Sequence, residues 1–220
     1  MKKGLIITID GPSGAGKSTV AKMLARSLGY TYIDTGAMYR GIAYAYKTHG
    51  ASPLNDMEGF LENLSMRFEF GETARVFLDD KDISEDIRGP EISLLASNLS
   101  QKKEVREYLT KKQRAIGENG GIVMEGRDTG SIVFPDADIK FYLDANPDER
   151  AKRRHVELSA KGIDDEISRV KEEMSRRDRD DSERDIAPLT IPQGAVVIDT
   201  TGVNATGVAD ALLKHINVLR

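Results

Sequence analysis

Residues 11–18 read Gly-Pro-Ser-Gly-Ala-Gly-Lys-Ser and fit the pattern G-x-x-x-x-G-K-[ST]. They follow an apolar run at residues 4–10, which is typical of a buried parallel strand, and they open residues 17–28, whose apolar side chains have helical spacing. Glycines let a backbone wrap closely around a phosphate, and a helix N-terminus adds positive potential there. A glycine-rich turn with a capping serine is the alternative. The strand, loop and helix in this order favour a phosphate-binding loop (P-loop).

The chemistry of this loop predicts an ATP site. The Lys17 ammonium can reach the outer phosphates, and the Ser18 hydroxyl can ligate Mg²⁺. We therefore expect Mg²⁺ as cofactor and ATP as co-substrate. The residues predicted to bind ATP from this loop are Gly11, Pro12, Ser13, Gly14, Ala15, Gly16, Lys17, Ser18 and Thr19.

The rest of the chain predicts an α/β fold with three layers, helix–sheet–helix, around a five-stranded parallel sheet. Further strands are expected at residues 30–34, 121–125, 138–143 and 195–199. Helices are expected at residues 17–28 (ended by Gly29), 35–46, 91–99, 105–117 and 208–219, with a long charged helical stretch at 147–179. At about residues 60–90, segments 66–70, 75–78 and 81–87 predict a small antiparallel insertion instead.

Composition limits the classes of function. A chain of 220 residues suits a single domain, residues 1–220, that needs no disulfide, and it has no cysteine. The net charge of −4 argues against nucleic acid as a partner. No apolar run approaches the roughly 20 residues of a membrane span, and the apolar stretch 5–9 is too short for a signal peptide. We expect a cytoplasmic protein without membrane contact.

Arginines distinguish among the kinds of P-loop protein. The chain lacks the Asn-Lys-x-Asp sequence that reads guanine, and none of its acidic strand ends shows the Asp-Glu pair of motor ATPases. Arg40 and Arg127 each follow a predicted strand, so both should lie at the carboxyl edge of the sheet, where ligands bind in open α/β folds. Either arginine alone could form a surface ion pair, and most of the charged stretch 150–179 is expected to be a solvated face. Together with the P-loop, these arginines favour a small kinase whose acceptor carries a phosphate.

At this point the sequence resembles the bacterial cytidylate kinases, nearly from end to end. Four motifs carry the resemblance: Gly-Pro-Ser-Gly-Ala-Gly-Lys at 11–17, Asp-Thr-Gly-Ala-Met-Tyr-Arg at 34–40, Glu-Gly-Arg-Asp at 125–128 and Arg-Asp-Ile-Ala-Pro-Leu at 184–189. The resemblance implies a P-loop kinase of nucleoside monophosphates that transfers the γ-phosphoryl of ATP to CMP or dCMP. It also implies a monomer, a monophosphate-binding insertion at residues 60–100 and a lid at residues 154–165.

The resemblance also implies roles for individual residues. The acceptor phosphate would be held by Arg40, Arg127 and Arg184, and cytosine would be read by Ser97, Arg106 and Asp128. The sugar hydroxyls would contact Arg177 and Asp181, with Arg176 and Arg179 as neighbouring alternatives to Arg177. Thr35 and Tyr39 would complete the acceptor site, and Arg154 of the lid would reach the ATP phosphates. Lys17, Arg127 and Arg184 would be the catalytic residues. Arginine forks suit phosphate oxygens, and a carboxylate or hydroxyl can accept from the cytosine amino group.

The predicted mechanism needs no general base. The second pKa of a phosphate monoester is about 6, so the acceptor is already mostly ionised at neutral pH. Catalysis would then consist of positioning and charge neutralisation, with closure of the lid excluding water. Two alternatives stay open: another small-molecule P-loop kinase acting on UMP or a non-nucleotide acid, and a nucleotide-binding regulator without transferase activity.

Overall fold

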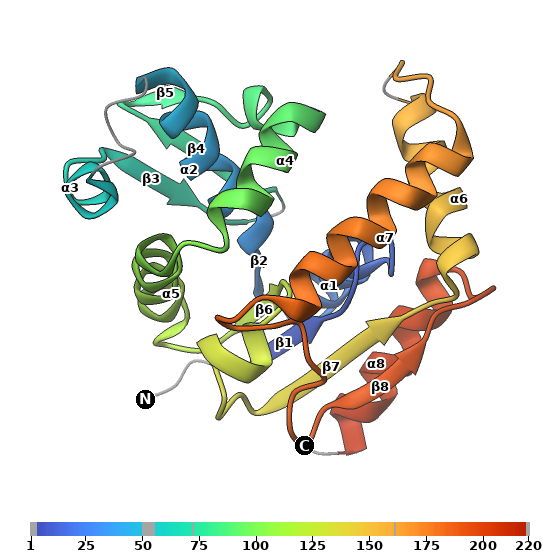
Figure 1. Ribbon diagram of the computed structural model, residues 1–220. Helices are drawn as coiled ribbons and strands as arrows, with labels where there is room; N and C mark the ends of the chain where they lie inside the picture. The colour runs from blue at the N-terminus through green and yellow to red at the C-terminus, as the bar shows by residue number, and fades with distance from the viewer. Residues whose placement is uncertain (1–3, 50–55, 72, 161, 219–220) are drawn as a thin grey trace.

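The computed structural model describes residues 4–49, 56–71, 73–160 and 162–218. Its main sheet has five parallel strands in the order β2-β6-β1-β7-β8. Their bounds are Ile6–Asp10 for β1, Thr31–Asp34 for β2, Ile122–Glu125 for β6, Ile139–Asp144 for β7 and Val196–Asp199 for β8. The predicted five-stranded parallel sheet is thus confirmed (Figure 1).

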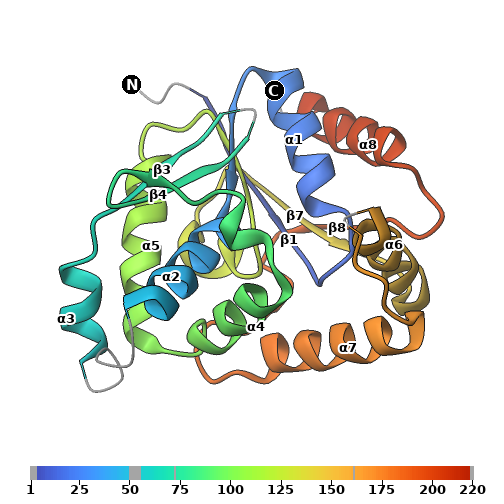
Figure 2. The ribbon, with the colours of Figure 1, turned by 90° about the horizontal axis from the view of Figure 1, so that it is seen from above.

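Helices cover both faces of this sheet and make the three layers. Viewed from above, α1 (Lys17–Leu28) and α8 (Ala205–Val218) lie on one side, with α2 (Thr35–His49) and α5 (Lys103–Gly117) on the other (Figure 2). One core joins α1 and α8 to the strands through side chains such as Leu24, Phe141 and Leu212, all fully buried. Strands this apolar on both faces require helices on both faces.

Two structures project beyond the carboxyl ends of the strands. The first is the antiparallel unit, with β3 (Met66–Glu69), β4 (Arg75–Leu78) and β5 (Lys81–Asp82), followed by a 3₁₀ turn (Asp86–Arg88) and α4 (Pro90–Leu99). The second is a helical hairpin of α6 (Pro147–Ala160) and α7 (Ile167–Glu183). Figure 1 shows them on opposite sides of the sheet edge, with α4 and α7 facing each other across it.

The helical stretch predicted at 147–179 is wrong as a single element, because α6 ends at Ala160 and α7 begins at Ile167. The backbone N–H of Ile163 donates to the oxygen of Leu158 at 3.0 Å, which closes α6, and the chain then reverses. The third strand expected at 81–87 is only Lys81–Asp82 before the 3₁₀ turn. A short helix, α3 (Met57–Glu62), and a π-type turn (Thr129–Val133) were not predicted. Glu72 of the predicted insertion, residue 161 of the predicted lid and Leu219 at the end of the last predicted helix lie outside the described residues.

The register of the sheet places acidic residues together at one edge. Asp34 at the end of β2 pairs with Glu125 at the end of β6, and Asp144 pairs with Asp199 across β7 and β8. Asp10 ends β1 beside them. This edge is where the P-loop leaves β1, so the fold brings the strand ends and the loop to one place. Within the described part of the chain, no helix is both long and apolar enough to cross a bilayer.

Candidate active site

A cavity of about 360 Å³ opens at the carboxyl edge of the sheet. The P-loop, the start of α2, the segment after β6, α4 and the end of α7 all contribute to its wall. Most of the predicted site residues line it: Ser13, Gly14, Lys17, Ser18, Thr35, Tyr39, Arg40, Ser97, Arg106, Arg127, Asp128, Arg154, Arg177, Asp181 and Arg184. Of the predicted loop residues, Gly11, Pro12, Ala15, Gly16 and Thr19 do not line it.

The P-loop has its shape because of where it leaves the sheet. Gly11 has φ 145°, and a Cβ atom there would lie 2.0 Å from the backbone oxygen of Leu143 on the neighbouring strand. No other residue fits that position without moving the strand. The loop then enters α1 at Lys17, and the first turn of a helix has backbone N–H groups without intrahelical partners that can bind an anion.

Lys17 is buried at the base of the cavity. Its Nζ donates to the backbone oxygen of Pro12 at 2.7 Å, and only 5% of the residue is exposed. Burial, with Arg127 nearby, lowers the pKa of Lys17 to about 7, against the attraction of Glu125 and Asp10. The site therefore holds a cation in an environment that disfavours its charge, and an anionic group beside it would restore that charge.

Ser18 contacts Glu125, a carboxylate that the sequence analysis placed at a strand end and in the motif at 125–128 but gave no role. Its hydroxyl donates to Glu125 Oε1 at 2.5 Å, and the Tyr32 hydroxyl donates to the same oxygen at 2.9 Å. A hydroxyl and a carboxylate are hard oxygen ligands of the kind Mg²⁺ prefers, and Mg²⁺ usually takes only one or two protein ligands beside phosphates and water. The residues present at this position therefore fit a magnesium ion.

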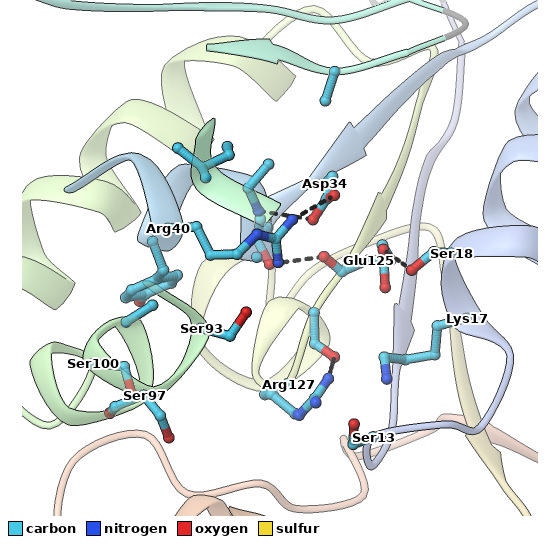
Figure 3. Close-up of a pocket in the computed structure, with 18 of the residues that line it drawn as sticks. Ser13, Lys17, Ser18, Asp34, Arg40, Ser93, Ser97, Ser100, Glu125 and Arg127 are labelled. Carbon is cyan, nitrogen blue, oxygen red and sulfur yellow. Dashed lines mark hydrogen bonds and ion pairs between the residues drawn. The ribbon is translucent and has the colours of Figure 1, made fainter. Parts of the chain in front are cut away.

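Arg40 reaches the cavity from α2. Its guanidinium lies 3.3 Å from Asp34 Oδ2, while the other carboxylate oxygen of Asp34 accepts from the Ala37 N–H at 2.9 Å. Asp34 thereby caps the start of α2 and orients Arg40 at the same time. Figure 3 shows Arg40 and Arg127 reaching toward the same space as Lys17.

A chain of buried ion pairs joins β6, α5 and the end of α7. Arg127 donates from Nε to Asp181 at 2.9 Å, and Arg184 lies 3.4 Å from the same carboxylate. Arg184 also lies 3.8 Å from Asp128, which pairs with Arg106. Although burial opposes it, the three neighbouring cations Arg127, Arg177 and Arg184 hold the pKa of Asp181 below its usual value. These ion pairs hold the arginine side chains in place in the absence of a ligand.

Two arginines of the helical hairpin also line the cavity. Arg154 on α6 lies 2.8 Å from Glu157 Oε2. Arg177 on α7 differs, because it has no carboxylate within ion-pair distance among the described residues, and its buried Nε has no hydrogen-bond partner there. Burial and then Arg127 lower the pKa of Arg177 to about 10. Arg177 is therefore a cation that no carboxylate of the described residues pairs with directly, although Asp181 attracts it from beyond ion-pair distance.

The structure also places residues in or behind the site that the sequence did not indicate. Ser93 of α4 and Ser100, which caps the end of α4, line the cavity beside Ser97 at about one helical turn on either side (Figure 3). Asp10 is fully buried and accepts from the N–H groups of Thr129 (2.8 Å) and Gly130 (2.7 Å), which anchors the turn after Asp128 to the P-loop strand. Burial raises the pKa of Asp10 to about 6 against these hydrogen bonds. The serine spacing at 93, 97 and 100 was the available signal for α4, whereas nothing local marked Asp10.

Proteins of known family resemble this chain along nearly its whole length. The family model described as cytidylate kinase matches residues 7–218. A cytidylate kinase of Caldanaerobacter subterraneus subsp. tengcongensis is 50% identical over 96% of this chain and 93% of its own length. A cytidylate kinase of Geobacter sulfurreducens is 45% identical over 96% and 92%.

The fold has more distant likenesses as well. A shikimate kinase structure from Acinetobacter baumannii has a TM-score of 0.51 with 16% identity, covering 99% of this chain and 95% of that one. This likeness shows the P-loop kinase fold alone. The match of the family model over nearly the whole chain, together with relatives at 45–50% identity, places this protein in the cytidylate kinase family.

Proposed function

We propose that this protein transfers the γ-phosphoryl group of ATP to CMP or dCMP, which gives ADP and CDP or dCDP. One observation supports this above all others. Arginines from separate segments, Arg40 on α2, Arg127 after β6 and Arg184 after α7, line the same cavity as the P-loop lysine. A site with a donor loop on one side and fixed arginines on the other suits two phosphate-bearing substrates.

The arginine chain supports an acceptor role for the side of the cavity away from Lys17. Arg127 and Arg184 are both oriented by Asp181, so their remaining N–H groups are available to a phosphate without loss of rotamer freedom. Arg106 and Asp128 form the adjacent buried pair, which offers donors and an acceptor on neighbouring groups. Cytosine presents the complementary set of an amino donor beside ring-nitrogen and carbonyl acceptors. We assign the cytosine contacts to this pair and to Ser97.

The donor side consists of the P-loop and the helical hairpin. Backbone N–H groups at the start of α1 and the Lys17 ammonium would hold the ATP phosphates, with Arg154 approaching from α6. Ser18 and Glu125 would hold Mg²⁺, which neutralises charge on the phosphates when bound. The ionised acceptor phosphate would attack in line, so no residue is needed to remove a proton.

Charge neutralisation is the main catalytic contribution of the chain. Two polyanions repel each other, and the arginines offset that repulsion so that the reacting atoms can meet. Closure of the hairpin at residues 154–165 and of the insertion at residues 60–100 would exclude water, the competing nucleophile. Closure is tested by measuring the rate of ATP hydrolysis in the absence of an acceptor. A hydrolysis rate as high as the rate of CMP phosphorylation would contradict the exclusion of water.

An acceptor panel tests the proposed function. Pure protein is incubated with Mg-ATP and either CMP, dCMP, UMP, AMP, GMP or shikimate, and ADP formation is followed together with the phosphorylated product. CMP and dCMP should give the highest kcat/KM. A preference for UMP or shikimate would assign the protein to another acceptor, and ADP formation that is independent of every acceptor would contradict transferase activity.

A further inference from the structure

The backbone of Ser13, within the P-loop, is held at both its N–H and its carbonyl oxygen by side chains of the helical hairpin. The Ser13 N–H donates to Asp178 Oδ1 on α7 at 3.0 Å, and the Ser13 oxygen accepts from Arg150 NH1 on α6 at 3.0 Å. Arg150 also forms an ion pair with Asp178 and donates from Nε to the Ala145 oxygen at 3.0 Å. The roles assigned above to the P-loop and the cavity arginines do not account for this clamp.

The clamp is tight and largely shielded from water. A Cβ atom at Gly14 would lie 2.8 Å from Met174 Cε and 2.9 Å from the Arg150 oxygen, so both helices pack directly against the loop. The side chains of Arg150 and Asp178 are only 11% and 16% exposed. Hydrogen bonds to charged groups in such surroundings are among the stronger ones, and losing one partner leaves the other poorly solvated.

Charge makes the pairing of the two side chains necessary. A carboxylate on a phosphate-binding loop would repel the phosphates of ATP if it stood alone. Arg150 contacts both Asp178 and Ser13, so the pair presents no net charge to the loop while each member keeps its hydrogen bond. The acidic group can then fix the backbone of the loop without opposing the nucleotide.

The helix that carries Asp178 also carries groups on the acceptor side. Arg177 is the adjacent residue and lines the cavity, and Asp181, one turn further, orients Arg127. Asp178 therefore connects the donor loop to the helix that holds the acceptor arginine in place.

We propose that Asp178, supported by Arg150, is a positioning residue that holds the P-loop in the conformation that binds ATP. This inference rests on the proposed function only in taking ATP as the donor. It assigns to α7 a role in donor binding, in addition to the acceptor contacts of Arg177 and Asp181. The effect should be selective, because Asp178 contacts the P-loop and none of the residues assigned to cytosine.

The test compares D178A with D180A, which removes a carboxylate from the same helix at an exposed position with no ion pair among the described residues. Titration with a fluorescent ATP analogue, without acceptor, gives the donor Kd, and calorimetry gives the CMP Kd. We expect D178A to raise the ATP Kd by about tenfold or more, since a hydrogen bond to a charged group is lost. The CMP Kd of D178A and both constants of D180A should stay within about twofold of the parent, as for surface substitutions.

A double variant separates positioning from general destabilisation. If Arg150 neutralises Asp178 on the loop, R150M should weaken ATP binding more than R150M/D178A does, because the single variant leaves an unpaired carboxylate beside the P-loop and the double variant removes it. Thermal melts identify variants that fail to fold. If the variants that lack Arg150 do not fold, the ATP Kd and CMP Kd of D178A alone test the inference. An unchanged ATP Kd in D178A, or equal weakening of ATP and CMP, would overturn the inference. Weakened ATP binding in a protein that does not phosphorylate CMP would leave the clamp standing and refute the proposed acceptor.

Discussion

The Ser18 hydroxyl donates to Oε1 of Glu125 at 2.5 Å, which links the P-loop to the end of strand β6 across 107 residues of chain. Both groups are oxygen ligands suited to Mg²⁺. Removing even an outer-shell partner of a metal site lowers metal affinity by roughly 10- to 100-fold, so removing the charge of a ligand should cost at least as much. E125Q should therefore raise the Mg²⁺ concentration for half-maximal activity by about tenfold at saturating nucleotides. The measurement is a Mg²⁺ titration of the initial rate.

The matched control for this carboxylate is Y32F. The Tyr32 hydroxyl donates to the same Glu125 oxygen at 2.9 Å, so Y32F removes a hydrogen bond and leaves the carboxylate charge in place. The Mg²⁺ requirement of Y32F should stay near that of the parent. A Mg²⁺ requirement that E125Q leaves unchanged would show that this carboxylate does not support the metal.

The lowered pKa of Lys17 leads us to expect that ATP binding depends on pH. Burial and Arg127 lower its pKa to about 7 in the free protein, and the ATP phosphates, as opposite charges, should raise that pKa in the complex. The complex then binds more protons than the free protein above pH 7, so ATP affinity falls as pH rises, by up to about tenfold per pH unit. Calorimetry at pH 8 in buffers of different ionisation enthalpy should detect proton uptake on ATP binding.

The control for proton uptake is K17M, which removes the titrating group while keeping much of the side-chain volume. K17M should bind ATP weakly and without the Lys17-linked uptake. Burial raises the pKa of Asp10 to about 6, so this carboxyl is mostly ionised in the free protein at pH 8. Uptake of equal size in K17M and the parent would assign the proton to another group.

Substitution of Asp128 should weaken binding of the acceptor nucleotide selectively. It lies between Arg106 and Arg184, on the cavity wall assigned to cytosine. D128N keeps the size of the side chain and removes its charge, and we expect CMP to bind about tenfold or more weakly while ATP changes little, since the contact belongs to one substrate. D136N, at an exposed position a few residues further on, is the control. Equal weakening of both nucleotides by D128N would contradict a base-reading role.

The fold and the P-loop were predictable because their signals are local. An apolar strand, the glycine-lysine-serine motif and the spacing of α1 lie within residues 4–28, and parallel strands bring their carboxyl ends to one edge. That rule alone placed Arg40 and Arg127 beside Lys17. Arg184 and Asp181 came from the resemblance, because the charged stretch in which they lie has no pattern that separates site residues from solvated ones.

The contacts that organise the site were not predictable, because they join distant segments. Asp178 reaches Ser13 across 165 residues, and Glu125 reaches Ser18 across 107. No local periodicity carries such pairings. The division of the stretch 147–179 into α6 and α7 was missed for a related reason: both helices are polar on most positions, so the hydrophobic pattern that would mark a break is weak.

Removal of the Arg177 charge should have opposite effects on stability and on activity. Among the described residues it is the cavity arginine without a carboxylate partner, and burial lowers its pKa to about 10. A half-buried charge without a directly paired carboxylate destabilises a fold, so R177M, which keeps most of the side-chain volume, should raise the free energy of unfolding by about 1 kcal/mol without ligand. The same change should lower kcat, since the charge awaits a phosphate or the sugar of a bound nucleotide. Arg40, which has Asp34 as partner at 3.3 Å, supplies the comparison: R40M breaks a pair and should not stabilise the protein. Urea unfolding without nucleotide measures the first effect, and a lower unfolding free energy for R177M would show that the cation is already compensated within the fold.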